Sequence, residues 1–108
     1  MESIKWSDVE EVEARAGIYR RTVTMGSIQV VMYRYLPGSV FEEHSHPEEQ
    51  LTIGERGSLE FIVGGRRSIF GAGDIIHIPP DVPHAAANME DVEAVTLNVY
   101  SPVRGSAP

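Results

Sequence analysis

Short runs of β-branched and aromatic residues, broken repeatedly by glycine, proline and aspartate, constrain the fold of this 108-residue chain most strongly. Apolar and polar residues alternate within several runs, which is typical of strands with one buried face. Gly64-Gly65 separates two of them and is a typical two-residue hairpin turn. The runs cover residues 18–24, 28–36, 40–46, 50–56, 59–63, 66–70, 75–78 and 92–100. Such a series of short strands without a long helix predicts an antiparallel sandwich or barrel.

The residues ahead of these runs predict a short N-terminal helix. Ser7, with Glu10 three residues later, has the form of a capping box, and Val9, Val12 and Ala16 recur at roughly helical spacing. A chain of this length supports one hydrophobic core, so we expect a single domain over residues 1–108.

The charge of the chain limits its partners. Sixteen acidic against nine basic residues give a net charge of −7, which argues against binding to nucleic-acid phosphates or to an anionic membrane. No apolar run approaches the ~20 residues of a membrane-spanning helix, and the first residues lack the apolar core of a signal peptide. We therefore expect a cytoplasmic protein.

The chain has no cysteine, so any metal site depends on nitrogen and oxygen donors. His44 and His46 are separated by one residue, which places both imidazoles on one face of an extended strand. Continuing the alternation brings Glu48 and Gln50 to the same face, whereas Glu49 faces away. Two imidazoles with an oxygen donor are most of a first-row metal site.

A second stretch presents another histidine after a strand and a proline-rich turn. The first stretch contains Gly38, His44, His46, Gln50 and Gly57, and the second contains Gly73, Pro79, Asp81, His84 and Asn88. In order and spacing, the two stretches resemble the two conserved motifs of the cupin superfamily. Gln50 stands at the usual glutamate position and Asp81 at the usual glycine.

The cupin resemblance implies a double-stranded β-helix, or jelly roll, whose ligands lie on inward faces near one mouth of the barrel. It implies that His44, His46, Gln50 and His84 hold a divalent transition metal, namely Zn, Ni, Fe, Mn or Cu. Glu48 and Glu49 remain alternatives to Gln50 as the oxygen ligand. The resemblance also implies a homodimer and a small-molecule substrate.

A donor set of three imidazoles and one amide would leave the +2 charge of the ion uncompensated. Such a site favours an anionic oxygen of the substrate and Lewis-acid work on a carbonyl. We therefore expect the substrate to be a small anionic, oxygen-rich organic acid.

The C-terminal region carries a narrower resemblance. Its segment from Val99 to Arg104 is similar to that of the small pectin-degradation cupins that linearise unsaturated uronates. That resemblance implies pocket roles for Tyr100 and Arg104, the latter pairing with a substrate carboxylate. It places Asn98 where those cupins have an aspartate that is a candidate for proton transfer.

His77, on the strand that leads to His84, is a further candidate: it either lines the cavity as a general base or packs between layers. The leading hypothesis is a metal-dependent enzyme that isomerises a small organic acid by proton transfer. The alternatives are a cupin dioxygenase and a binding module without catalysis.

Overall fold

The alternating segments form strands close to the places predicted for them, and the computed structural model describes residues 1–104. The elements are η1, a 3-10 turn (Trp6–Asp8), β1 (Val12–Arg15), β2 (Ile18–Met25), β3 (Ile28–Tyr35), β4 (Val40–His44), β5 (Glu49–Arg56), β6 (Ser58–Val63), β7 (Arg66–Gly71), β8 (Ile75–Ile78), β9 (His84–Ala87) and β10 (Ala94–Ser101). Among the described residues, no helix is long and apolar enough to cross a bilayer.

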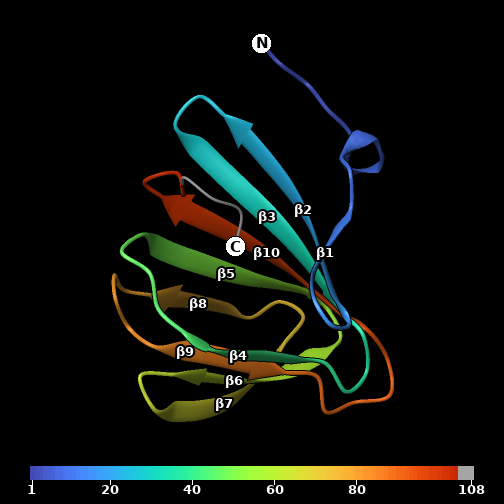
Figure 1. Cartoon of the computed structure of the whole chain (residues 1–108), viewed down its shortest axis with the longest axis vertical. Helices are drawn as coiled ribbons and strands as arrows, with labels where there is room; N and C mark the ends of the chain where they lie inside the picture. The colour runs from blue at the N-terminus through green and yellow to red at the C-terminus, as the bar shows by residue number, and fades with distance from the viewer. Residues whose placement is uncertain (105–108) are drawn as a thin grey trace.

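The strands build two antiparallel sheets that face each other (Figure 1). One sheet has six strands in the order β1-β2-β3-β10-β5-β8, and the other has four in the order β4-β9-β6-β7. The predicted hairpins form as β2–β3 and β6–β7, the second with Val63 opposite Arg66 across the glycine pair. The predicted all-β jelly roll is confirmed.

The core lies between the two sheets. Alternate residues of β3 point inward, so that Val31, Tyr33 and Tyr35 are buried, and aromatic residues of β4, β6 and β7 meet them from the other side. The buried apolar residues are Ile18, Val31, Tyr33, Tyr35, Phe41, Leu59, Phe61, Phe70, Ile78, Ala86, Ala94 and Tyr100.

The N-terminal region is helical only over the single turn η1. Val12, which fits the helical spacing, instead pairs with Arg20 as the first residue of β1, and Ala14 packs against the core. Pairing with the edge of β2 supplies backbone hydrogen bonds and burial that a short amphipathic helix would lack, so tertiary context overrides the weak helical pattern.

Strand β9 was not predicted, because its alanines have low intrinsic preference for strands. It forms because it lies between β4 and β6, where Ala86 pairs with Phe41 on one side and Phe61 on the other. A small side chain fits between these aromatic residues. Strand β9 therefore forms because it pairs with β4 and β6.

Gly54 in β5 allows the turn between β7 and β8 to approach closely. Its N–H donates to the Asp74 carbonyl at 2.9 Å, and its carbonyl accepts from the Gly73 N–H at 2.9 Å. A Cβ at this position would overlap the Gly71 carbonyl oxygen and lie 2.8 Å from the Gly71 carbonyl carbon. Any larger residue would therefore force β5 away from this turn.

We predict that Gly54→Ala lowers the free energy of unfolding by about 3 kcal/mol, because the added methyl group meets backbone that cannot yield. Gly71→Ala is the matched control, since its Cβ would lie 3.7 Å or more from its neighbours, and it should change stability by under about 1 kcal/mol. Urea unfolding of both variants measures the difference. Equal losses of stability in the two variants would show that the close approach of Gly71 does not restrict the residue at position 54.

Candidate metal centre

The four predicted ligand residues lie together, and they come from both sheets. His44 ends β4 and His84 begins β9, and the two are partners across these strands. Gln50 is the second residue of β5 in the other sheet, and His46 lies in the segment that crosses between the sheets. The four residues therefore lie together because the chain crosses from one sheet to the other. They do not lie on one extended strand, as was expected from the sequence.

The three imidazole rings are in mutual contact. Ring centroids are 4.2 Å apart for His44 and His84, 5.0 Å for His46 and His84, and 5.9 Å for His44 and His46. One ring nitrogen from each histidine lies within 4.8 Å of the other two. His46 and His84 are buried, and His44 is partly buried.

Backbone carbonyls fix the tautomer of each histidine. The Nδ1 atoms of His44, His46 and His84 each lie 2.9 Å from a main-chain carbonyl oxygen, belonging to Glu42, Glu48 and Val82 respectively. Because a carbonyl oxygen only accepts, each Nδ1 carries the proton and donates it. Each Nε2 therefore offers a lone pair, as metal-bound histidines require.

A buried polar network orients the Gln50 amide. Its Nε2 donates to the Thr52 hydroxyl at 2.9 Å and to Asn98 Oδ1 at 3.1 Å. Thr52 also donates to Asn98 Oδ1, and the Asn98 amide donates to the Val31 carbonyl and to Thr96. These contacts turn Gln50 Oε1 toward the histidines.

Two features of this cluster fit a cation. Gln50 Oε1 lies 2.9 Å from His46 Nε2, so two lone-pair atoms face each other without a hydrogen between them in the neutral tautomer. His84 Nε2 is buried and has no hydrogen-bond partner among the described residues. A divalent ion bonded at about 2.0–2.2 Å to these atoms would satisfy both. His44, His46, His84 and Gln50 could thus hold a transition metal.

Burial keeps two of the three histidines, His44 and His84, neutral. Desolvation lowers the pKa of His84 to about 4 and also lowers the pKa of His44, although the backbone hydrogen bond of each ring opposes the shift. The imidazoles of His44 and His84 are therefore unprotonated at neutral pH, which is the form that binds metals.

Tyrosine hydroxyls share the space beside the histidines. A cavity of about 20 Å³, enough for one water, is lined by residues that include Tyr33, His44, Gln50, His84 and Tyr100. Desolvation raises the pKa of Tyr33 and raises that of Tyr100 to about 12, so both phenols keep their protons. The Tyr33 hydroxyl has no partner among the described residues, which leaves a free donor in the cavity.

Arg104 lies beside the cluster. Its guanidinium carbon is 5.5 Å from the centre of the Tyr100 ring, and its Nε is 3.5 Å from a carboxylate oxygen of Glu48. Its Nη1 is buried and unpaired within residues 1–104. Glu48 also approaches His46 Nδ1, so its carboxylate lies on the side of that ring away from Nε2.

Of the two other candidates, Asn98 lines the cavity and contacts Gln50, whereas His77 lies outside the cluster. His77 is exposed and pairs with Glu49, so it neither lines the cavity nor packs between layers as the sequence analysis proposed. This follows from β8, where the neighbouring residue Ile78 is fully buried and His77 consequently faces outward. Asn98 is buried, and its amide is occupied by protein groups.

Asp81 has a φ of 65°, the left-handed conformation for which glycine is usually chosen, and aspartate tolerates it better than most residues. Its N–H donates to the His46 carbonyl at 2.8 Å. This hydrogen bond joins the turn that contains Asp81 to the segment that contains His46.

Tyr33 and Thr52 were not predicted from the sequence to belong to the site. Both lie on inward faces, Tyr33 beside the cavity and Thr52 beneath Gln50. Strand alternation from Val31 and from Gln50 would have placed them there, but a tyrosine or threonine in a strand is common without a site.

The Cupin domain family model matches residues 31–100, about two thirds of the chain. The chain is a cupin. The H2HPP isomerase of Bacillus subtilis is 28% identical over 89 residues, and the match spans 82% of this chain but only 38% of that protein.

Solved structures share the fold of this cupin. An RmlC-like cupin from Shewanella frigidimarina has a TM-score of 0.84 at 22% identity, covering 92% of this chain and 88% of its own. KdgF from a Halomonas species has a TM-score of 0.84 at 22% identity, covering 92% and 91%. The predicted membership of the cupin superfamily is confirmed.

We predict that the metal-free cupin loses stability as the pH falls from about 6.5 to about 4. Unfolded histidine takes up a proton near pH 6.5, whereas folded His84 stays neutral until about pH 4, so protonation favours the unfolded chain within that window. Between these two pH values, the free energy of unfolding of His84→Gln should fall by about 2 kcal/mol less than that of wild type. This value allows for solvent screening. The urea unfolding midpoints of chelator-treated protein at several pH values measure this difference. His77→Gln, a change at an exposed site, is the control and should lose as much stability as wild type.

Proposed function

We propose that this cupin is a metal-dependent isomerase that moves a proton on a small anionic organic acid. The observation that carries the proposal is the juxtaposition of four neutral donor atoms with two protonated phenols and an arginine in one closed space. The isomerase relative supports the reaction class, since it is 28% identical over most of this chain. The substrate remains a proposal because the chain spans little more than a third of that relative.

His44, His46, His84 and Gln50 would hold the ion, which is Zn, Ni, Fe, Mn or Cu. When bound, a divalent ion polarises a carbonyl oxygen and stabilises negative charge that develops on it. All four ligands are neutral, so the site keeps a net positive charge that favours an anionic substrate. Asn98 and Thr52 position Gln50 by holding its amide nitrogen.

Arg104 supplies the contact with a carboxylate. Its unpaired Nη1 is a donor already removed from bulk water, and guanidinium–carboxylate pairs are strong when desolvated. Glu48 holds Nε at 3.5 Å and so keeps the side chain beside Tyr100. A substrate larger than water requires these side chains to move apart, because the cavity has room for about one water.

The phenols of Tyr33 and Tyr100 supply protons or hydrogen bonds. Both stay protonated at neutral pH, so they can donate to an oxygen that gains charge. Asn98 cannot take the role of a carboxylate in proton transfer, because an amide does not titrate. Within this proposal, tyrosine at position 33 or 100 therefore replaces the aspartate of the uronate-linearising cupins.

We predict that chelation of the metal abolishes turnover of a 4,5-unsaturated uronate, and that one of the five metals restores it. Solvent deuterium incorporation, followed by NMR in D₂O with the uronate and a panel of 2-oxo acids, detects proton transfer directly. Oxygen uptake without deuterium incorporation would indicate the dioxygenase, and metal-dependent binding without either would indicate a binding module. Full activity after complete removal of metal would reject the mechanism.

We predict that Arg104→Gln lowers kcat/KM by about 10- to 100-fold, mainly through KM, because a charged hydrogen bond worth about 1.5–3 kcal/mol is lost. Arg104→Lys should recover part of it. Arg66→Gln, an exposed change on β7, is the matched control and should leave the kinetics unchanged. An unchanged KM in Arg104→Gln would remove Arg104 from the substrate site.

A further inference from the structure

Two aromatic rings close one side of the cavity beside the histidines. Tyr33 of β3 and Phe41 of β4 both line this cavity, and their ring centroids are 5.4 Å apart with the planes nearly perpendicular. Phe41 also stacks on His44, with ring centroids 4.6 Å apart. Beyond these rings the six-stranded sheet continues into β2 and β1, whereas β4 is the edge strand of its own sheet. The inner face of β1 and β2 therefore borders the candidate metal centre through Tyr33 and Phe41.

An arginine adjoins each of these two rings. The guanidinium carbon of Arg15, the last residue of β1, lies 4.1 Å from the centre of the Phe41 ring. Arg20 of β2 is the cross-strand partner of Tyr33. Directly opposite residues share one face of a sheet, so Arg20 lies on the inner face beside Tyr33. Two cations thus lie just outside the pair of rings.

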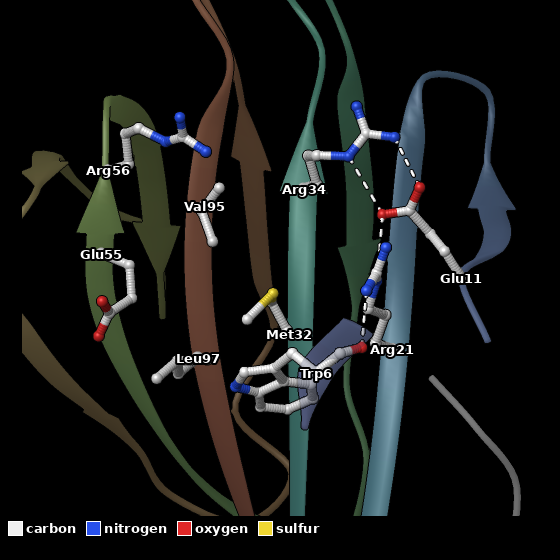
Figure 2. A pocket seen from close by; sticks show the side chains of 9 residues that line it. All are labelled: Trp6, Glu11, Arg21, Met32, Arg34, Glu55, Arg56, Val95 and Leu97. Carbon is white, nitrogen blue, oxygen red and sulfur yellow. Dashed lines mark hydrogen bonds and ion pairs between the residues drawn. The ribbon is translucent and has the colours of Figure 1, made fainter. Parts of the chain in front are cut away.

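These two arginines lack a carboxylate partner. Neither Arg15 nor Arg20 forms an ion pair with a described residue, although the chain contains sixteen acidic side chains. The outer face of the same sheet differs, because Figure 2 shows Arg21 and Arg34 both held by Glu11. Arginine stays protonated in proteins, so the inner edge carries two positive charges that residues 1–104 leave uncompensated.

Two hydroxyl groups beside these arginines are also free. Thr22 lies two residues from Arg20 on the same face of β2, and its Oγ1 is buried without a hydrogen-bond partner in the part of the chain described. The buried Tyr33 hydroxyl likewise has none there. Buried polar groups are normally paired, so both hydroxyls are available to an oxygen of a ligand.

Arg20 and Arg104 reach the Tyr33 hydroxyl from different positions. Desolvation is the largest cause of the raised pKa of Tyr33, and the positive charges of Arg104 and Arg20 both oppose it. The Arg104 N–H donates to Gln29 Oε1 at 3.4 Å, so Arg104 enters beside Gln29. Gln29 and Tyr33 are about 13 Å apart along β3. Two arginine side chains can shorten this gap, so a short dicarboxylate can bridge it.

We propose that Arg20 and Arg15 form a second anion subsite, so that the substrate of this cupin is a dicarboxylate. The proposal rests on the proposed function, in which Arg104 receives the first carboxylate. Arg20 contacts the second carboxylate as a fork of two N–H groups, and the exposed guanidinium of Arg15 adds to the attraction.

The balance of charge around the cavity supports two negative charges on the substrate. Glu48 already offsets the charge of Arg104, to which its carboxylate is 3.5 Å away. Arg15 and Arg20 therefore remain as the uncompensated side-chain charges beside the rings. Because Arg20 is partly exposed and Arg15 exposed, a second carboxylate meets them without opening the small cavity.

Calorimetric titration of the zinc-loaded full chain with 2-oxoglutarate and 2-oxopentanoate tests the proposal, because these acids differ only in a terminal carboxylate. Wild type should bind 2-oxoglutarate at least about 10-fold more tightly, since the second carboxylate gains a charged hydrogen bond. Arg20→Gln should remove most of this preference, and Arg15→Gln should lower it about two-fold, because an exposed charge is screened. Arg66→Gln, which removes an exposed charge on β7, is the matched control and should keep the preference.

Equal affinity of wild type for the two acids would overturn the proposal, and so would an unchanged preference in Arg20→Gln or no binding of 2-oxoglutarate. Deuterium incorporation tests the proposed function separately. A preference that depends on Arg20, without deuterium incorporation from either acid, would support the subsite and reject the isomerase.

Circular dichroism checks that the variants fold. Should Arg20→Gln unfold, arginine modification of wild type with phenylglyoxal decides, with the modified residues located by mass spectrometry. 2-Oxoglutarate should protect Arg20 from the reagent more strongly than 2-oxopentanoate, whereas Arg66 should react equally with either acid present. Equal protection of Arg20 by the two acids would overturn the proposal.

Discussion

Three hydrogen bonds from histidine Nδ1 atoms to main-chain carbonyls hold the rings of the candidate metal centre. They decide which nitrogen each ring presents, and they use acceptors whose positions are set by the backbone. One nitrogen of each ring lies within 4.8 Å of the other two before any ligand arrives, so little side-chain freedom has to be lost on binding. The specificity of the centre thus begins with the course of the main chain around His44, His46 and His84.

The polar layer beneath the centre extends this control to Gln50. Its amide has only one orientation that satisfies Thr52 and Asn98 together, because Asn98 Oδ1 accepts while its nitrogen is used by Val31 and Thr96. Buried polar networks of this kind specify a single arrangement when every member is satisfied. The same residues make the inner face of the six-stranded sheet unusually polar, while apolar residues occupy the outer face.

The sequence was most informative where period and spacing carried the information. Alternation located the strands on either side of Gly64-Gly65, and the spacing of the histidines identified candidate metal ligands that the structure brings together. It was least informative where neighbours decide the outcome: β9 needs β4 and β6 beside its alanines, and β1 needs the edge of β2. The orientation of His77 depended on which residue of β8 is buried, and the isoleucines around it left that open. Alternation from Val31 predicts that Tyr33 points inward, but a tyrosine in a strand is common without a site, so it did not indicate the cavity.

The distribution of donors between the sheets has a thermodynamic consequence. His44 and His84 belong to the four-stranded sheet and Gln50 to the six-stranded one, so an ion shared by them joins the two layers at a point where only side chains meet. Binding free energy at such a junction adds to the cohesion of the barrel, because the separated layers cannot offer the same donors. The melting temperature of this protein would then report the free metal concentration around it.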